Sequence, residues 1–193
     1  MAKKVLIIST SIRTGSNSEI LANAFADGAR ASGNEVEIVS LRDKTISFCR
    51  GCFACQKLGH CVIKDDANEI TEKLLGAEVV VWATPIYYYE MCGQMKTMID
   101  RANSLFSRDY QFRDVYLLSV AAENEDYTDE GAVKGLQGWA DAGGRTGYAQ
   151  VDIHADAVAQ GTDAVLHRPY RLCQQEGGAQ GLEPFPAHQY RRV

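Results

Sequence analysis

Four of the chain's six cysteines lie within thirteen residues, in the stretch CRGCFACQKLGHC at positions 49–61, which we call the cysteine loop. Cys49, Cys52, Cys55 and Cys61 have the spacing C-x2-C-x2-C-x5-C. Thiolates this close in sequence can bind a [4Fe–4S] cluster or zinc, form disulfides, or exchange electrons as free thiols. The spacing taken by itself is typical of ferredoxin-like ligation of a cluster.

A second chemically rich stretch is STSIRTGSNS, residues 9–18, which we call the phosphate loop. It joins an apolar run to a helical pattern, so free backbone N–H groups and the positive end of a helix meet there and favour an anion. Ser16 with Glu19 would suffice to cap the helix. The planar cation of Arg13 and the further hydroxyl groups exceed that need and predict phosphate binding. The loop contains neither a Walker motif nor a G-x-G-x-x-G fingerprint.

Strands and helices must alternate to position these loops. Four apolar or alternating segments predict strands, at residues 5–10, 35–41, 78–85 and 115–121. Four segments with helical spacing predict helices, at residues 16–33, 65–77, 93–106 and 130–142. In the second helix, Asp66 and Glu69 have the spacing of a capping box. The alternation predicts a doubly wound α/β fold with a parallel sheet.

Composition narrows the class of protein. The 193 residues suggest one domain with a sizeable core, and the net charge of −5 provides no basic surface for nucleic acid. No apolar run is long enough to span a membrane. We expect the opening MAKKVLIIST to be a strand rather than a signal peptide, because no cleavage site follows it. We therefore expect a cytoplasmic protein, in which stable disulfides are rare.

The phosphate loop, with its pattern S-x-R-x-x-S-N-S after a first strand, resembles the NADPH-dependent FMN reductase family of the flavodoxin-like proteins. The stretch ATPIYYYEMCGQMK, residues 83–96, looks like the isoalloxazine-binding loop of that family, and we call it the flavin loop. The resemblance implies a five-stranded parallel sheet in the order 2-1-3-4-5. In that order a ligand binds between the first and third strands, which is where both loops fall.

The resemblance also implies which residues bind FMN. Those expected around its phosphate are Ser9, Ser11, Arg13, Ser16, Asn17 and Ser18. Those expected around the flavin ring are Pro85, Ile86, Tyr87 and Tyr88, joined by Ala122, Glu123 and Asn124 after the fourth strand. The tyrosines could instead pack internally or at a subunit interface. We expect Lys96, Asp100 and Arg101 to be solvated or ion-paired rather than catalytic.

The implied activity is that of an FMN-dependent NAD(P)H oxidoreductase. A nicotinamide would pass hydride to the flavin, and electrons would go on to a flavin, quinone, nitro compound, metal ion or partner protein. Hydride transfer needs no side-chain acid or base, so no catalytic residue is predicted. The family also implies a homodimer or tetramer. A non-catalytic flavin-binding redox sensor is an alternative, and steady NAD(P)H oxidation would exclude it.

The cysteine loop leaves a further alternative open. A compact cysteine motif at this point, followed by CVIKDD, also resembles the iron–sulfur flavoproteins, a sister group in the same superfamily. We order four interpretations of the loop: idle or redox-sensitive thiols beside FMN alone, then a [4Fe–4S] cluster on all four cysteines, then zinc, then a stable disulfide. With a cluster, the protein would be an electron carrier that splits electron pairs into single steps.

Residues 143–193 differ from the predicted FMN-binding core at residues 1–142. No lysine follows Lys134, and three of the four prolines and three of the four histidines fall in this segment. The pattern predicts only a weak fifth strand at 150–158 and a short helix near 163–174, completing or trailing the same domain. One hypothesis is a shifted reading frame from about residue 143, and a divergent native tail is the alternative. Resequencing the gene distinguishes them.

Overall fold

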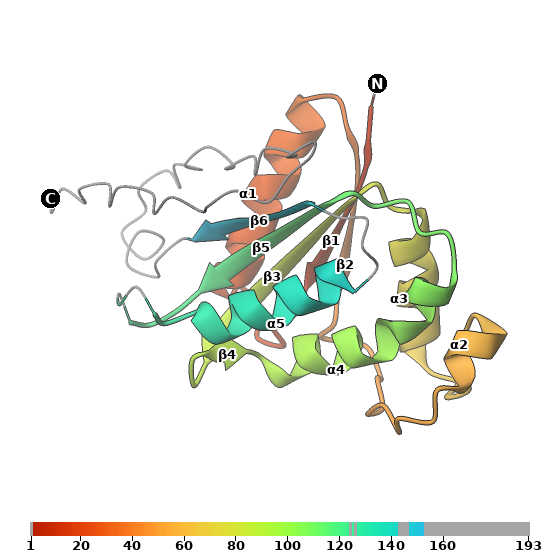
Figure 1. Ribbon diagram of the computed structural model, residues 1–193. Coiled ribbons are helices and arrows are strands. Elements are labelled where there is room, and N and C mark those ends of the chain that lie inside the picture. Colours follow the sequence, from red (N-terminus) through yellow and green to blue (C-terminus); the bar gives the residue numbers. More distant parts are fainter. Residues whose placement is uncertain (1, 124, 126, 143–146, 153–193) are drawn as a thin grey trace, which may run out of the picture.

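The computed structural model describes residues 2–123, 125, 127–142 and 147–152, and its centre is a twisted sheet with helices on both faces (Figure 1). The strands are β1 (Lys4–Ser9), β2 (Glu35–Ser40), β3 (Val79–Tyr87), β4 (Glu90–Met91), β5 (Asp114–Val120) and β6 (Gly147–Asp152). The helices are α1 (Asn17–Ala31), α2 (Ala54–Leu58), α3 (Asp66–Gly76), α4 (Gly93–Arg101), the 3-10 helix η1 (Ala102–Ser107) and α5 (Glu130–Asp141).

The sheet confirms the predicted fold class. Its parallel strands lie in the order β2-β1-β3-β5-β6, which is the predicted order 2-1-3-4-5 once β4 is set aside. The sheet has six strands rather than five because β4 pairs antiparallel with the end of β3, with Tyr87 opposite Glu90. The fifth parallel strand was predicted at 150–158 and lies at 147–152. The predicted helix near 163–174 lies outside the described residues.

Helices cover the sheet unequally. Among the described helices, α1 covers one face and buries Leu21 and Ala26 against Ile7 and Val81. On the other face α3, α4 and α5 bury a larger apolar cluster that includes Trp82 (Figure 1). Its aromatic members interlock, and the ring centroids of Trp82 and Trp139 are 5.7 Å apart in an edge-to-face contact. The apolar residues 5–8 of β1 and 79–83 of β3 are buried on both faces, as continuous hydrophobic strands predict.

Two predicted element boundaries were wrong. The helix predicted at 93–106 ends at Arg101 and continues as the tighter 3-10 helix η1. The capping box predicted at Asp66 and Glu69 is absent, because the N-cap of α3 is Asp65, whose carboxylate accepts from Ala67 N–H at 3.2 Å. The Asp66 carboxylate instead accepts from Thr45 N–H at 2.6 Å. Within the described ranges, every helix is too short or too polar to cross a lipid bilayer.

Candidate functional site

Three loops meet at one edge of the sheet because β1, β3 and β5 are adjacent and parallel. Ser9 at the end of β1 lies opposite Ala83, and Pro85 near the end of β3 lies opposite Val120. The phosphate loop, the flavin loop and the segment after β5 therefore leave the sheet side by side. This edge between β1 and β3 is the topological switch point at which open α/β sheets bind ligands.

The phosphate loop combines a capped helix with polar groups that lack partners. Ser16 is the N-cap of α1, and its Oγ accepts from Glu19 N–H at 3.3 Å and lies 3.2 Å from Ser18 Oγ. The Ser9 hydroxyl is buried and has no hydrogen-bond partner among the described residues. Arg13 is exposed, and no described side chain or carbonyl pairs with its guanidinium. The loop therefore presents a cation and unpaired donors to the outside.

Arg42, which was not predicted from the sequence, stabilises the phosphate loop through hydrogen bonds to Arg13 and Glu19. Its Nη2 donates to Glu19 Oε2 at 2.7 Å and to Arg13 O at 3.2 Å, while Glu19 Oε2 also accepts from Gly15 N–H at 2.8 Å. Partial burial raises the pKa of Glu19, but the donors Gly15 and Arg42 outweigh it and hold that pKa below its usual value. Arg42 follows the end of β2, at the same edge of the sheet, and that position was the only available signal.

Cys92 joins the phosphate loop to the flavin loop. The residue is 1% exposed, and its Sγ lies 3.1 Å from Thr10 Oγ1. Thr10 also donates from its backbone N–H and its Oγ1 to Ala83 O, both at 2.9 Å. On the other side, Cys92 N–H donates to Thr84 Oγ1 at 3.2 Å. These contacts fix the start of α4 against the ends of β1 and β3.

The flavin loop turns through two tyrosines in an unusual backbone conformation. Tyr88 and Tyr89 have φ angles of 51° and 66°, and they form the two-residue turn between the paired residues Tyr87 and Glu90. Such turns normally contain Asn or Gly, because other side chains are strained at positive φ. Tyr88 is 97% exposed. A strained turn that presents an aromatic side chain to solvent points to a functional constraint rather than to packing.

The third loop closes on the flavin loop. Tyr89 OH donates to Glu123 Oε2 at 3.3 Å, and the negative charge of Glu123 raises the pKa of Tyr89. Ala122 and Glu123 are exposed, and Asn124 lies outside the described residues. The turn is also supported by α5, because a Cβ added at Gly131 would lie 2.5 Å from Tyr89 O. The contact between Tyr89 and Glu123 thus joins the segment after β5 to the flavin loop.

All four cysteines of the cysteine loop line one cavity of about 500 Å³ between that loop, α4 and α5. The other lining residues include Arg101, Asn103, Phe106 and Trp139. Two of the sulfurs already accept hydrogen bonds, Cys49 from Gly51 N–H at 3.4 Å and Cys55 from Asn103 Nδ2 at 3.5 Å. None of the five described cysteines is in a disulfide. Four cysteines with free thiols therefore line the same cavity.

The four sulfurs do not converge on a point in this structure. Among the described residues, no three His, Cys, Asp or Glu side chains are close enough together to hold one metal ion. The donor set is nevertheless that of a cluster site, four thiols with N–H donors beside them. Cluster ligation by Cys49, Cys52, Cys55 and Cys61 therefore stays a prediction.

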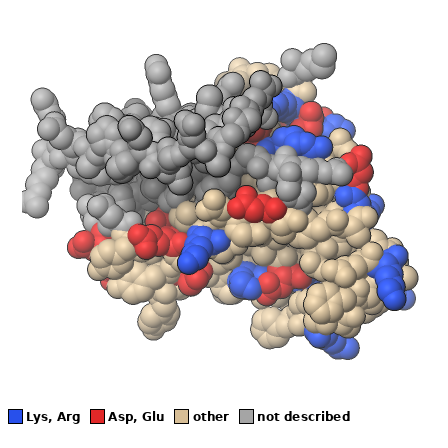
Figure 2. Space-filling view, viewed as in Figure 1, with Lys and Arg blue, Asp and Glu red and all other residues tan. Residues whose placement is uncertain are grey.

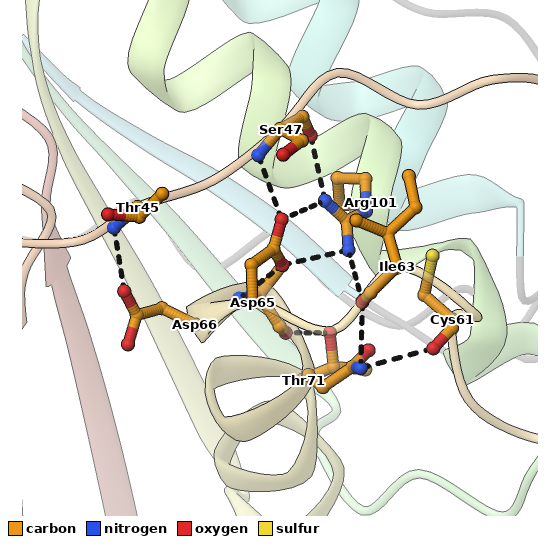
Figure 3. Close-up of polar contacts among 10 residues, drawn as sticks. Thr45, Ser47, Cys61, Ile63, Asp65, Asp66, Thr71 and Arg101 are labelled. Carbon is orange, nitrogen blue, oxygen red and sulfur yellow. Dashed lines mark hydrogen bonds and ion pairs between the residues drawn. The ribbon is translucent and has the colours of Figure 1, made fainter.

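A buried ion pair closes the base of the cysteine loop (Figure 3). Arg101, at the end of α4, binds Asp65 through both terminal nitrogens at 2.7 and 2.9 Å, and their side chains are 0% and 6% exposed. Arg101 also donates to Ser47 O at 2.7 Å and to Ile63 O at 3.2 Å, on the two sides of the loop. The expectation that Arg101 is ion-paired is confirmed, but its complete burial was not foreseen. Lys96 and Asp100 form an exposed pair at 2.7 Å.

A second cavity of about 580 Å³ lies beside the first and shares Lys96 and Asp100 with it. Neither cavity is lined by a residue predicted to bind FMN. Over the described part of the face that these helices present, basic and acidic side chains are interspersed (Figure 2). That face therefore offers no field of one sign to a highly charged partner.

Comparison with known proteins identifies the family of the chain. The family described as NADPH-dependent FMN reductase matches residues 3–133. An iron–sulfur flavoprotein of Methanocaldococcus jannaschii is 34% identical over 102 residues, which are 53% of each chain. An iron–sulfur flavoprotein of Methanosarcina thermophila is 32% identical over 111 residues, which are 58% of each chain. The chain thus spans about half the length of the curated relatives it matches.

Solved structures support the fold. An azoreductase from Bacillus anthracis superposes with a TM-score of 0.62 at 17% identity, over 82% of this chain and 92% of that one. At this level of identity the similarity concerns the fold alone. It agrees with the doubly wound sheet.

Proposed function

The chain belongs to the NADPH-dependent FMN reductase family, and from this premise we propose that it is an FMN-dependent NAD(P)H oxidoreductase. When bound, FMN supplies hydride acceptance from the nicotinamide and electron donation to a second molecule. The observation that carries the proposal is the meeting of the phosphate loop and the flavin loop at the edge between β1 and β3.

The phosphate loop fits the phosphate of FMN in three respects. The first turn of α1 leaves the backbone N–H groups of Asn17 and Ser18 without acceptors in the helix. The buried Ser9 hydroxyl has no partner among the described residues. Arg13 is an exposed cation that pairs with no other group among the described residues, and its guanidinium can donate two parallel hydrogen bonds to phosphate oxygens. Arg42 and Ser16 shape this loop, and Ser11 Oγ helps by accepting from Arg13 N–H at 3.2 Å.

The flavin ring would be held by the backbone of the other two loops. Pro85, Ile86 and Tyr87 follow β3 at the switch point, and Tyr88 extends from the strained turn beside them. Ala122, Glu123 and Asn124 follow β5 at the same edge. The role of these groups is to orient the ring and set its electrostatic surroundings, while no side chain of this chain has to move a proton.

The acceptor is proposed to be a small redox molecule such as a flavin, quinone or nitro compound, or a redox protein. The exposed tyrosines of the flavin loop suit either an aromatic acceptor or a second copy of the chain. The proposal therefore includes a homodimer or tetramer. It also includes a reducing, cytoplasmic location. Light scattering of the purified protein measures the oligomeric state.

Replacing Arg13 with alanine is expected to weaken FMN binding by about 10- to 100-fold, since a hydrogen bond to a charged group contributes about 1.5–3 kcal/mol. Quenching of FMN fluorescence during titration of the apoprotein measures the affinity. Arg30, at the opposite end of α1 and paired only with the exposed Asp27, provides the control. Arg30→Ala should bind FMN like the wild type. Equal affinities for all three proteins would show that the phosphate lies elsewhere.

Turnover separates an enzyme from a sensor. The FMN-loaded protein is expected to oxidise NADH or NADPH steadily once an electron acceptor is added. A protein that binds FMN and exchanges electrons only once would instead fit the redox-sensor alternative.

A second candidate function is that of an iron–sulfur electron carrier, and one observation favours it. Cys49, Cys52, Cys55 and Cys61 line the same cavity and stand free of disulfides. If they hold a [4Fe–4S] cluster, anaerobic reconstitution should yield about four iron and four sulfide per chain, with broad visible absorbance bleached by dithionite. A flavin spectrum alone, without iron or sulfide after reconstitution, would reject this candidate and leave the oxidoreductase proposal standing.

A further inference from the structure

One buried side chain contacts the chain on both sides of the cysteine loop. Arg101 binds a backbone carbonyl on each side of the loop, Ser47 O and Ile63 O, together with the carboxylate of Asp65 (Figure 3). Asn68 adds hydrogen bonds from its Nδ2 to Cys61 O at 3.1 Å and Ile63 O at 3.0 Å. The stem next to Cys61 is therefore held in place, whereas Cys49 and Cys52 are exposed.

The same arginine faces the sulfurs. Arg101 lines the four-cysteine cavity, and its buried Nε has no hydrogen-bond partner in the described part of the chain. Cys61 lines the same cavity, and the guanidinium of Arg101 is paired with the Asp65 carboxylate. A buried N–H donor without an acceptor is costly. Because this donor lies at the same cavity as the Cys61 thiol, we expect it to gain an acceptor when Cys61 is a thiolate that binds a ligand.

Two other sulfurs of the loop already show the kind of contact that this N–H could make. Gly51 N–H donates to Cys49 and Asn103 Nδ2 to Cys55. Arg101 and Asn103 lie two residues apart, where α4 passes into η1, so the Nε–H of Arg101, unpartnered among the described residues, lies close in sequence to the donor that Cys55 already uses. Hydrogen bonds to thiolate ligands orient them and set the potential of the group they hold.

We propose that Arg101 is a positioning residue for a sulfur-ligated metal group: it holds the base of the cysteine loop closed and gives its Nε–H to the Cys61 sulfur. This inference rests on the proposed iron–sulfur function. The buried cation also offsets part of the negative charge that four thiolates bring to the site.

The test compares two double variants that make the same chemical change. Arg101→Gln with Asp65→Asn removes the buried pair without leaving a charge alone. Arg108→Gln with Glu72→Gln is the matched control, because Arg108 also binds a loop carbonyl, Gly59 O at 3.3 Å, and a carboxylate of α3, but in an exposed setting. Both are titrated anaerobically with Co²⁺ alone, and thiolate-to-cobalt absorbance reports binding.

Loss of the buried pair is expected to weaken Co²⁺ binding at least tenfold, while the exposed-pair control stays within about threefold of the wild type. Circular dichroism and FMN affinity verify that each variant is folded. Should the buried-pair variant fail to fold, Arg101→Lys keeps the charge but lacks both the fork and Nε, and it should still bind Co²⁺ several-fold more weakly.

The reduction potential separates positioning of the sulfur from mere support of the loop. In the reconstituted cluster, Arg101→Lys should shift the potential to more negative values, because a sulfur without its hydrogen bond is the stronger donor. An unchanged potential, or equal Co²⁺ affinity in all variants, would overturn the role of Arg101 alone. A wild type that binds neither Co²⁺ nor a cluster would overturn the iron–sulfur function and this inference together.

Discussion

Replacing Asp65 with alanine is expected to destabilise the protein by about 3–5 kcal/mol, because it leaves Arg101 as an unpaired charge in the interior. The Arg101 side chain is 0% exposed, so water cannot replace the lost carboxylate. The substitution also removes the N-cap of α3 and the acceptor for Ser47 N–H. Urea unfolding followed by circular dichroism measures the change in free energy.

Glu72→Ala is the matched control, since Glu72 pairs with Arg108 at a solvent-exposed site of the same helix. Its cost should stay below about 1 kcal/mol, as for other exposed ion pairs. If the two substitutions lowered the free energy of unfolding equally, the Asp65–Arg101 pair would not be shielded from water.

The same pair should contribute to loss of stability in acid. Burial raises the pKa of Asp65, but Arg101 and the N–H groups of Ser47 and Ala67 lower it more, and the net pKa lies below its usual value of 3.8. A lowered pKa means that the unfolded chain takes up the proton first as pH falls. The stabilisation is therefore complete above about pH 4 and declines below it. The Arg101→Gln, Asp65→Asn double variant should lose less stability than the wild type between pH 5 and pH 3.

Replacing Gly131 with alanine should displace the strained tyrosine turn. The new Cβ would lie 2.5 Å from Tyr89 O and 2.8 Å from Glu90 Oε1, and the first of these is a backbone atom that cannot rotate away. We expect a loss of about 1–3 kcal/mol from overpacking. Because the turn continues into the flavin loop, FMN affinity should fall about tenfold as well. Thermal unfolding and FMN titration measure the two effects.

Gly138, on the same helix, supplies the control. No atom lies within 4 Å of a Cβ added there, so Gly138→Ala should stabilise α5 by up to about 1 kcal/mol through helix propensity. FMN affinity should not change. If Gly131→Ala were as stable as Gly138→Ala, the contact between α5 and the turn would not constrain the site.

Local patterns were enough to predict four of the parallel strands and the N-cap of α1, whereas the strand order came from the family resemblance. The apolar runs of β1 and β3 specify buried parallel strands, and the hydroxyl-rich turn after β1 specifies its own N-cap at Ser16. The choice between Asp65 and Asp66 as the cap of α3 was not local. Asp65 takes that position because Arg101, far along the chain, binds the same carboxylate. Sequence spacing contains no record of such a contact.

The contacts that shape the candidate site were the least predictable part. Arg42 and Arg101 bind backbone carbonyls in other loops, and a carbonyl is present at every position of a chain. The β3–β4 turn was missed for a different reason. Tyr88 and Tyr89 are poor residues for positive φ, so turn propensities argue against the turn that the structure contains. Local rules fail here at a position where function is the better explanation.

The closed base of the cysteine loop has an entropic consequence. Since Ser47 and Ile63 are bound by one side chain, the segment between them is a ring before any ligand arrives. In the chain-entropy description, closing a loop of about 15 residues costs about 3 kcal/mol. The protein loses this conformational entropy when it folds. Binding of a metal group then costs only the conformational entropy that the four cysteines still have. The ion pair thus acts as a non-covalent cross-link, because it orders the loop during folding rather than during metal binding. The metal affinity gained in this way requires no additional ligand residue.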